Sequence, residues 1–67
     1  MQTADELFNQ KSEWGAFHDV VWNAMGVEMS REELRVVFDS LPERVRDIAH
    51  TWGLSDTVFR DEVYVTL

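Results

Sequence analysis

The stretch SREELRVVFDSLPERVRDIAHTWG, residues 30–53, predicts two consecutive helices and so indicates the class of the fold. Ser30 and Glu33 have the spacing of a capping box, in which the two residues hydrogen-bond reciprocally at the start of a helix. We therefore expect a helix over residues 31–40. Val36 would point outward, and the apolar spacing predicts an inward face made of Leu34, Val37, Phe38 and Leu41.

A second helix is expected over residues 42–52. Ser40 and Glu43 repeat the capping-box spacing, and Pro42 is tolerated in a first helical turn because its missing N–H has no partner there. The inward face predicted for this helix consists of Val45, Ile48, Ala49 and Trp52.

Two further helices are predicted toward the N-terminus. Thr3 and Glu6 form another capping-box pair, which predicts a short helix over residues 4–10. Ser12 could cap a longer helix over residues 13–25. One apolar stripe of this helix consists of Trp14, Phe17, Val21 and Met25.

Gly26 and Gly53 each fit the left-handed residue that ends a helix. Leu54 is expected to fold back over the last turn before it. Ser55 can cap a final helix. Residues 63–67 are rich in β-formers but have no obvious partner strand, so we favour helix there and keep a terminal strand as the alternative.

These elements predict an all-α fold, a small compact bundle of three to four short helices, with a short C-terminal strand as the alternative ending. The chain has 67 residues, which suits a single domain over residues 1–67.

The charge of the chain is strongly negative: 13 acidic residues oppose 6 basic ones, for a net charge of −7. A field of this sign repels phosphate and steers the protein toward basic partners. A net charge of about 2–8 is also ordinary for a soluble small domain, so acidity that only keeps the protein soluble stays open as a second interpretation.

Composition also bears on location. The chain has no cysteine, which removes disulfides and thiolate chemistry. No apolar run approaches the ~18 residues of a membrane span, and the first residues lack the pattern of a signal peptide. We expect a cytoplasmic protein that does not bind membranes.

Catalytic and metal-binding motifs are absent from the sequence. There is no phosphate-binding glycine loop, nucleophile elbow or paired-histidine metal motif. His18 and its neighbour Asp19 fall on different helix faces, whereas His50 follows Asp47 by three residues and could contact it. We predict a protein that is not an enzyme and uses no cofactor or metal.

Residues 45–67 resemble a helix-turn-helix DNA reader. Ala49, Gly53 and Phe59 fall where that motif uses a small residue, a turn glycine and a core residue. Glu62 departs from the pattern, because it occupies a usually apolar position. The would-be recognition helix also carries three acids against Arg60 alone, and phosphates would repel it. We therefore keep a DNA-binding regulator, with a dimer as one of its forms, as the second hypothesis.

A protein-binding surface is the leading interpretation. Trp22 and Val36 are expected to stay exposed, with Tyr64 a third if the chain ends in a helix. Tryptophan and tyrosine are enriched in interface hot spots. Acidic residues on helix faces complete the predicted partner-binding set, which is Asp19, Trp22, Glu32, Glu33, Val36, Asp39, Glu43 and Asp47. A core-edge position is the plainer reading of Trp22.

Small size, acidity, a helical pattern without cysteine and the lack of catalytic motifs together resemble small phage-encoded inhibitors of bacterial defence, anti-CRISPR proteins among them. The resemblance implies a non-enzymatic inhibitor that imitates DNA and blocks a basic nucleic-acid-binding surface in the host cytoplasm. The protein would be a monomer or homodimer that binds no nucleic acid directly. An accessory or antitoxin-like subunit held through Trp22 or the C-terminal segment is a third hypothesis.

Overall fold

The computed structural model describes the whole chain, Met1–Leu67, as five helices with no strand. They are α1 (Ala4–Phe8), α2 (Lys11–Met25), α3 (Arg31–Ser40), α4 (Glu43–Trp52) and α5 (Thr57–Thr66). The predicted all-α bundle is confirmed, with one helix more than expected. The C-terminal residues continue α5, so the alternative of a terminal strand is wrong.

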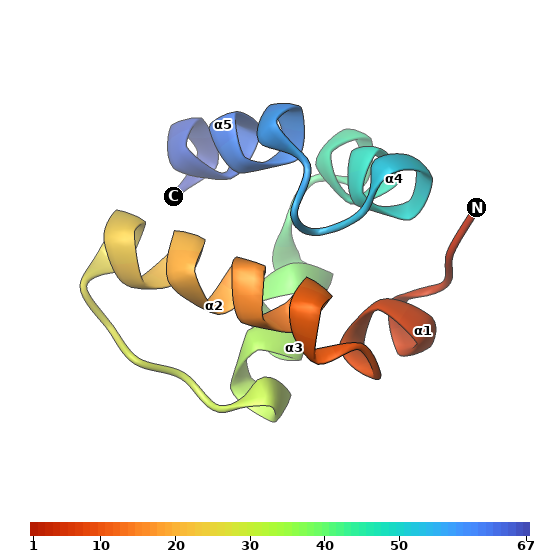
Figure 1. Cartoon of the computed structure of the whole chain (residues 1–67). Helices are drawn as coiled ribbons and strands as arrows, with labels where there is room; N and C mark the ends of the chain where they lie inside the picture. Colours follow the sequence, from red (N-terminus) through yellow and green to blue (C-terminus); the bar gives the residue numbers. More distant parts are fainter.

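The helices are arranged around α2, which contacts α1, α3 and α5, while α4 packs on α5. In Figure 1, α5 lies above α2 and the two run in the same direction, so their C-terminal ends lie at the same end of the molecule. The N-terminus lies at the opposite end, beside α1 and α4.

Two of the three predicted capping boxes are confirmed. The Glu6 N–H donates to Thr3 Oγ1 at 3.2 Å, and the Thr3 N–H donates to Glu6 Oε1 at 3.0 Å. Ser30 and Glu33 make the same reciprocal bonds at 3.2 and 2.9 Å. Helices α1 and α3 therefore begin where the sequence predicts.

Three predicted serine caps are wrong, each for a local reason. Helix α2 begins after Gln10, so Ser12 already lies in its first turn. The Ser40 hydroxyl donates to the Val37 carbonyl at 2.7 Å, and Pro42 is the N-cap residue of α4, which has no side-chain cap. The Asp56 carboxylate, not Ser55, accepts the first amides of α5.

The core is one cluster of buried apolar side chains with the ring of Phe38 at its centre. Its ring centroid lies 5.5 Å from that of Phe8, 6.2 Å from Phe17 and 6.4 Å from Phe59. The cluster consists of Leu7, Phe8, Phe17, Val20, Val21, Leu34, Phe38, Leu41, Val45, Ala49, Leu54, Phe59 and Val63. The rings of Phe8 and Phe17 meet Phe38 edge-to-face, and such pairs add to the stabilisation from buried area, whereas the Phe59 ring is tilted.

Two residues predicted to face inward do not. Trp52 is 70% exposed and Met25 is 46% exposed. Both are the last residues of their helices, α4 and α2, and lie outside the core cluster. In α2 the apolar stripe shifts instead toward Val20, which is buried.

Both predicted glycine endings are present, but only Gly26 adopts the left-handed helical conformation, at φ 70° and ψ 25°. Gly53 has φ 101° and ψ 162°, a region open essentially to glycine alone. Leu54 is fully buried as expected, and its N–H donates to Glu13 Oε2 at 2.7 Å. This bond ties the corner between α4 and α5 to the start of α2.

The N-terminal segment is held against α4 by a reciprocal pair of hydrogen bonds. The Gln2 N–H donates to the His50 carbonyl at 2.8 Å, and His50 Nδ1 donates to the Gln2 carbonyl at 2.7 Å. The imidazole also packs edge-on against Phe38. The contact with Asp47 that the sequence spacing allows is therefore not made, because the His50 ring bonds Gln2 and packs on Phe38.

Candidate functional site

The arginines are largely neutralised by the chain itself. Arg35 bonds both Asp5 and Asp39, at 2.7 and 3.3 Å. The remaining arginine pairs are Arg31 with Glu32, Arg44 with Glu62, and Arg60 with Asp61. Arg46 donates to the Leu41 carbonyl and has no ion-pair partner. The other carboxylates of the chain have no arginine or lysine partner, so the field outside the protein is negative.

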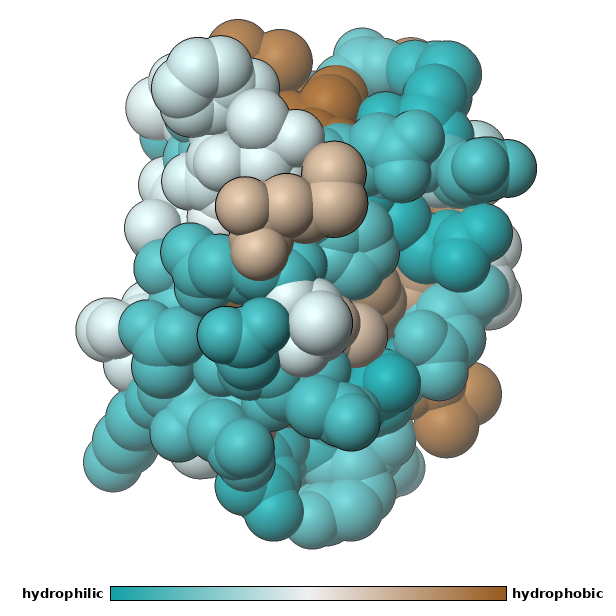
Figure 2. Space-filling view, turned by 90° about the vertical axis from the view of Figure 1, so that its right-hand side faces the viewer, coloured by the Kyte–Doolittle hydropathy of each residue, from teal (hydrophilic) through white to brown (hydrophobic).

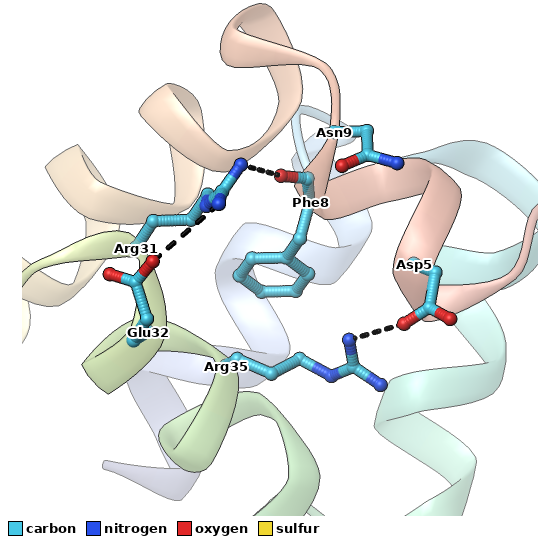
Figure 3. Close-up of a pocket in the computed structure, with 6 residues that line it drawn as sticks. All are labelled: Asp5, Phe8, Asn9, Arg31, Glu32 and Arg35. Atoms are coloured by element: carbon cyan, nitrogen blue, oxygen red, sulfur yellow. Dashed lines mark hydrogen bonds and ion pairs between the residues drawn. The ribbon is translucent and has the colours of Figure 1, made fainter.

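A shallow pocket of about 410 Å³ lies between α1 and α3. Figure 3 shows the Phe8 ring between two guanidinium groups, those of Arg31 and Arg35. Arg31 Nη1 donates to the Phe8 carbonyl at 3.4 Å, and the Arg35 guanidinium lies 5.8 Å from the centroid of the Phe8 ring. The hydrogen bond to Asp5 raises the pKa of Arg35 further above its ordinary value, against a smaller opposing effect of burial.

This pocket balances its charges, since Asp5 and Glu32 offset its two arginines. The two arginines of the pocket also pair with two predicted partner-binding residues, Arg31 with Glu32 and Arg35 with Asp39. The contacts of the lining residues hold α1 against α3, and each charged group in the pocket already has a partner in the chain.

The exposed face of α3 carries three predicted residues at helical spacing, namely Glu32, Val36 and Asp39. Val36 is 69% exposed, as expected. Glu33 is engaged by its capping box, where the backbone N–H and then the side chain of Ser30 lower the pKa of its carboxyl. Glu33 therefore acts first as a helix cap.

Glu43 and Asp47 are the least engaged carboxylates of the predicted set. They lie one turn apart on the exposed face of α4 and make no side-chain hydrogen bond or ion pair. The side of the molecule where α1 and α4 lie is covered mainly by hydrophilic side chains, with small apolar areas at its edges and one near its middle (Figure 2). These two carboxylates are free to meet a cationic partner.

A second hollow, of about 290 Å³, lies beside α2 and is lined by His18, Asp19, Trp22 and Glu28. We call it the Trp22 hollow. His18 Nδ1 lies 3.1 Å from Asp19 Oδ1, and Nε2 lies 3.7 Å from Glu28 Oε1. His18 and Asp19 lie on different faces of α2, as expected, but their side chains turn toward each other. Trp22 is half exposed, as predicted.

The predicted residues thus fall into three groups, on α2, α3 and α4. No hydrogen bond or ion pair joins one group to another. Sequence reasoning missed His18 and Glu28 as members of the α2 group. His18 stands one turn before Trp22, a signal that was present, whereas Glu28 enters only through the turn after Gly26.

The corner predicted from helix-turn-helix spacing is present, with residues 53–56 joining α4 to α5. Most of the basic groups on these two helices are paired, and Arg46, without an ion-pair partner, donates to the Leu41 carbonyl. Arg60 is paired with Asp61, and Arg44 is paired with Glu62 across the two helices. Tyr64 lies exposed on α5, as expected for a helical ending.

No protein-family profile, curated protein or solved structure matches this chain. No group of three histidine or acidic side chains is placed to hold a metal ion. None of the helices combines the length and apolar composition needed to cross a lipid bilayer.

Proposed function

We propose that this protein is a non-enzymatic, acidic binder that covers a basic, nucleic-acid-binding surface on a protein partner. One observation carries the proposal: the chain neutralises nearly all of its own arginines and leaves most of its carboxylates without a cationic partner. Such a body attracts basic protein surfaces and repels polynucleotides.

Helix geometry supports the imitation of a phosphate track. Residues one turn apart on a helix have Cβ atoms about 5–6 Å from each other, so acidic residues at this spacing present a row of negative charges. Glu43 and Asp47 form such a row on α4, and Glu32 and Asp39 extend the negative surface on α3 even though each has an arginine neighbour. Val36 and Trp22 add exposed apolar area of the kind that anchors an interface.

An inhibitor of the anti-CRISPR type, acting in the cytoplasm of a phage-infected host, is the specific form of this proposal. A basic groove that normally holds DNA or RNA is the surface such a protein would occupy. The residues that would meet it are Asp19, Trp22, Glu32, Glu33, Val36, Asp39, Glu43 and Asp47, among which Glu33 contributes mainly as a cap.

The test uses the intact protein as bait in host lysate at low and high salt, followed by binding measurements on each partner recovered. Neutralising the free pair with Glu43→Gln and Asp47→Asn is expected to weaken binding about 2- to 10-fold and to flatten its salt dependence. The recovered partner should also lose its nucleic-acid binding when the protein is added.

A matched variant controls for net charge. Glu6→Gln with Asp61→Asn removes the same charge, and glutamine can still complete the capping box at Thr3. If both double variants weaken partner binding equally, or if the affinity does not change with salt concentration, the proposal that these carboxylates contact the partner is refuted.

The helix-turn-helix hypothesis remains the second candidate, supported by the α4–α5 corner. It predicts duplex DNA binding that weakens on Arg60→Ala. Absence of any gel shift with random duplexes at low salt would remove it. The third hypothesis, an accessory or antitoxin-like subunit, predicts that Trp22→Ala abolishes association with a larger complex while the fold persists.

A further inference from the structure

We propose that the Trp22 hollow binds a single arginine side chain supplied by a protein partner. The inference rests on the proposed function, because a basic partner is what would present such a side chain. It adds two residues, His18 and Glu28, to the contact surface and assigns one chemical group as the occupant.

The first argument is the charge of the hollow. Asp19 and Glu28 lie against opposite nitrogens of the His18 ring. The imidazole can carry at most one positive charge, so the two carboxylates outweigh it in either of its protonation states. Neither carboxylate has an arginine or lysine partner, and the side chains are 78% and 76% exposed. The hollow therefore carries negative charge that the chain leaves uncompensated.

The second argument is the aromatic wall. Trp22 lies one helical turn after His18 and leaves 49% of its surface exposed. Indole is the best aromatic partner for a cation that stacks on its face, and guanidinium stacks more readily than ammonium because it is planar and weakly hydrated. A guanidinium group can also bond a carboxylate through two parallel N–H groups.

The third argument is that the protein already contains one arginine held by an aromatic ring and two carboxylates. Arg35 lies over the Phe8 ring and bonds two carboxylates, those of Asp5 and Asp39. The Trp22 hollow offers the same set of one aromatic ring and two carboxylates. In the first site the arginine comes from the chain, whereas no arginine of the chain reaches the second.

Size also favours one side chain. The hollow of about 290 Å³ falls just below the range of ~300–1,000 Å³ that is usual for small-molecule sites. It is open to solvent and shallow, which suits a side chain that projects from a larger surface.

The experiment titrates the folded protein with a blocked Gly-Arg-Gly peptide and follows the indole N–H signals by NMR. Trp22→Leu identifies the Trp22 signal by its absence. We expect a saturable shift of that signal, with smaller shifts at Asp19 and Glu28, and none with the uncharged citrulline peptide. A Gly-Lys-Gly peptide should bind at least about 2-fold more weakly.

Matched variants locate the site. Asp19→Asn with Glu28→Gln should weaken arginine-peptide binding at least about 5-fold, and Trp22→Leu, followed at the Asp19 and Glu28 amides, about 2- to 5-fold. Glu43→Gln with Asp47→Asn removes equal charge elsewhere and should leave the peptide affinity unchanged. Equal affinity for the lysine peptide, or equal weakening by the α4 variant, would overturn the assignment.

The outcome is separable from that of the proposed function. Suppose the arginine peptide does not shift the Trp22 signal, while the affinity of a recovered basic partner still depends on Glu43 and Asp47. The arginine site is then wrong, and the proposed acidic binding function is retained. If the peptide binds at Trp22 but no recovered partner loses its nucleic-acid binding, the hollow is real and the blocking role is wrong.

Discussion

Two corners of this bundle begin with a glycine, and they use similar residues in opposite ways. The α2–α3 corner, residues 26–30, is mostly exposed, and its carboxylate Glu28 faces solvent beside the Trp22 hollow. The α4–α5 corner, residues 53–56, buries Gly53 and Leu54, and the carboxylate that meets it, Glu13, accepts a backbone N–H. A carboxylate is thus structural where the fold brings it an amide donor, and available for binding where it does not.

The largest predicted difference between the corners concerns the residue after each glycine. Leu54→Ala empties a fully buried position and should cost about 2–5 kcal/mol, which is comparable with the whole stability expected of so small a domain. Val27→Ala at the exposed corner should cost less than about 0.5 kcal/mol. Urea unfolding followed by circular dichroism measures both, and similar midpoints would contradict the contrast.

The second largest difference is expected in the stability lost when each corner glycine is replaced by alanine. A Cβ at Gly53 would lie 3.0 Å from Glu13 Oε2 on a backbone with φ 101°, so Gly53→Ala should cost about 2–3 kcal/mol. Gly26→Ala meets no atom within 4 Å and should cost only about 1 kcal/mol, for its left-handed backbone. Thermal unfolding of the two variants sharpens the comparison, and a smaller loss for Gly53→Ala would contradict both the backbone strain and the crowding by Glu13.

The third largest difference is expected in the stability lost when the carboxylate of Glu13 or Glu28 is removed. Glu13→Ala leaves the half-buried Leu54 N–H without its acceptor and should cost about 1–2 kcal/mol, whereas Glu28→Ala should be close to neutral. Glu13→Gln keeps an acceptor oxygen and should recover part of the loss. Hydrogen exchange of the Leu54 amide reports the bond directly, and unchanged protection in Glu13→Ala would exclude the proposed tie.

The smallest expected effect is a loss of stability in acid. It concerns the exposed α2–α3 corner, which ends at the Ser30 capping box. Because the pKa of Glu33 is held below its usual value of 4.5, the folded state binds this proton less readily than the unfolded chain. The stabilisation is present at neutral pH and is lost as pH falls through the folded pKa. Glu33→Gln keeps the cap without titrating, so its stability should fall less between neutral pH and about pH 3.

Local signals predicted most of the fold. Thr3 and Ser30 start helices as expected because each finds its glutamate within one turn, and the inward positions Leu34, Phe38 and Val45 are buried. Ser40 fails as a cap because its hydroxyl bonds back into α3, a competition that residue type alone does not settle. Trp52 has the correct periodicity but lies past the end of the core.

The candidate surface was less predictable, because its defining contacts are not local. Exposure of Trp22 and Val36 follows from their helix positions. The engagement of Asp39 by Arg35 is an ordinary one-turn pair, but Asp5 joins the same arginine from another helix. No sequence spacing reveals that Glu13 reaches Leu54 or that Glu28 turns toward His18.

The reciprocal bonds between Gln2 and His50 bear on how the domain assembles during synthesis. A ribosome delivers Gln2 first, but its partner appears only when α4 has been made, and Glu13 must wait longer still for Leu54. Helices α1 and α2 can pack on each other through Phe8 and Phe17, but the rest of their apolar surface stays uncovered until the later helices have been made.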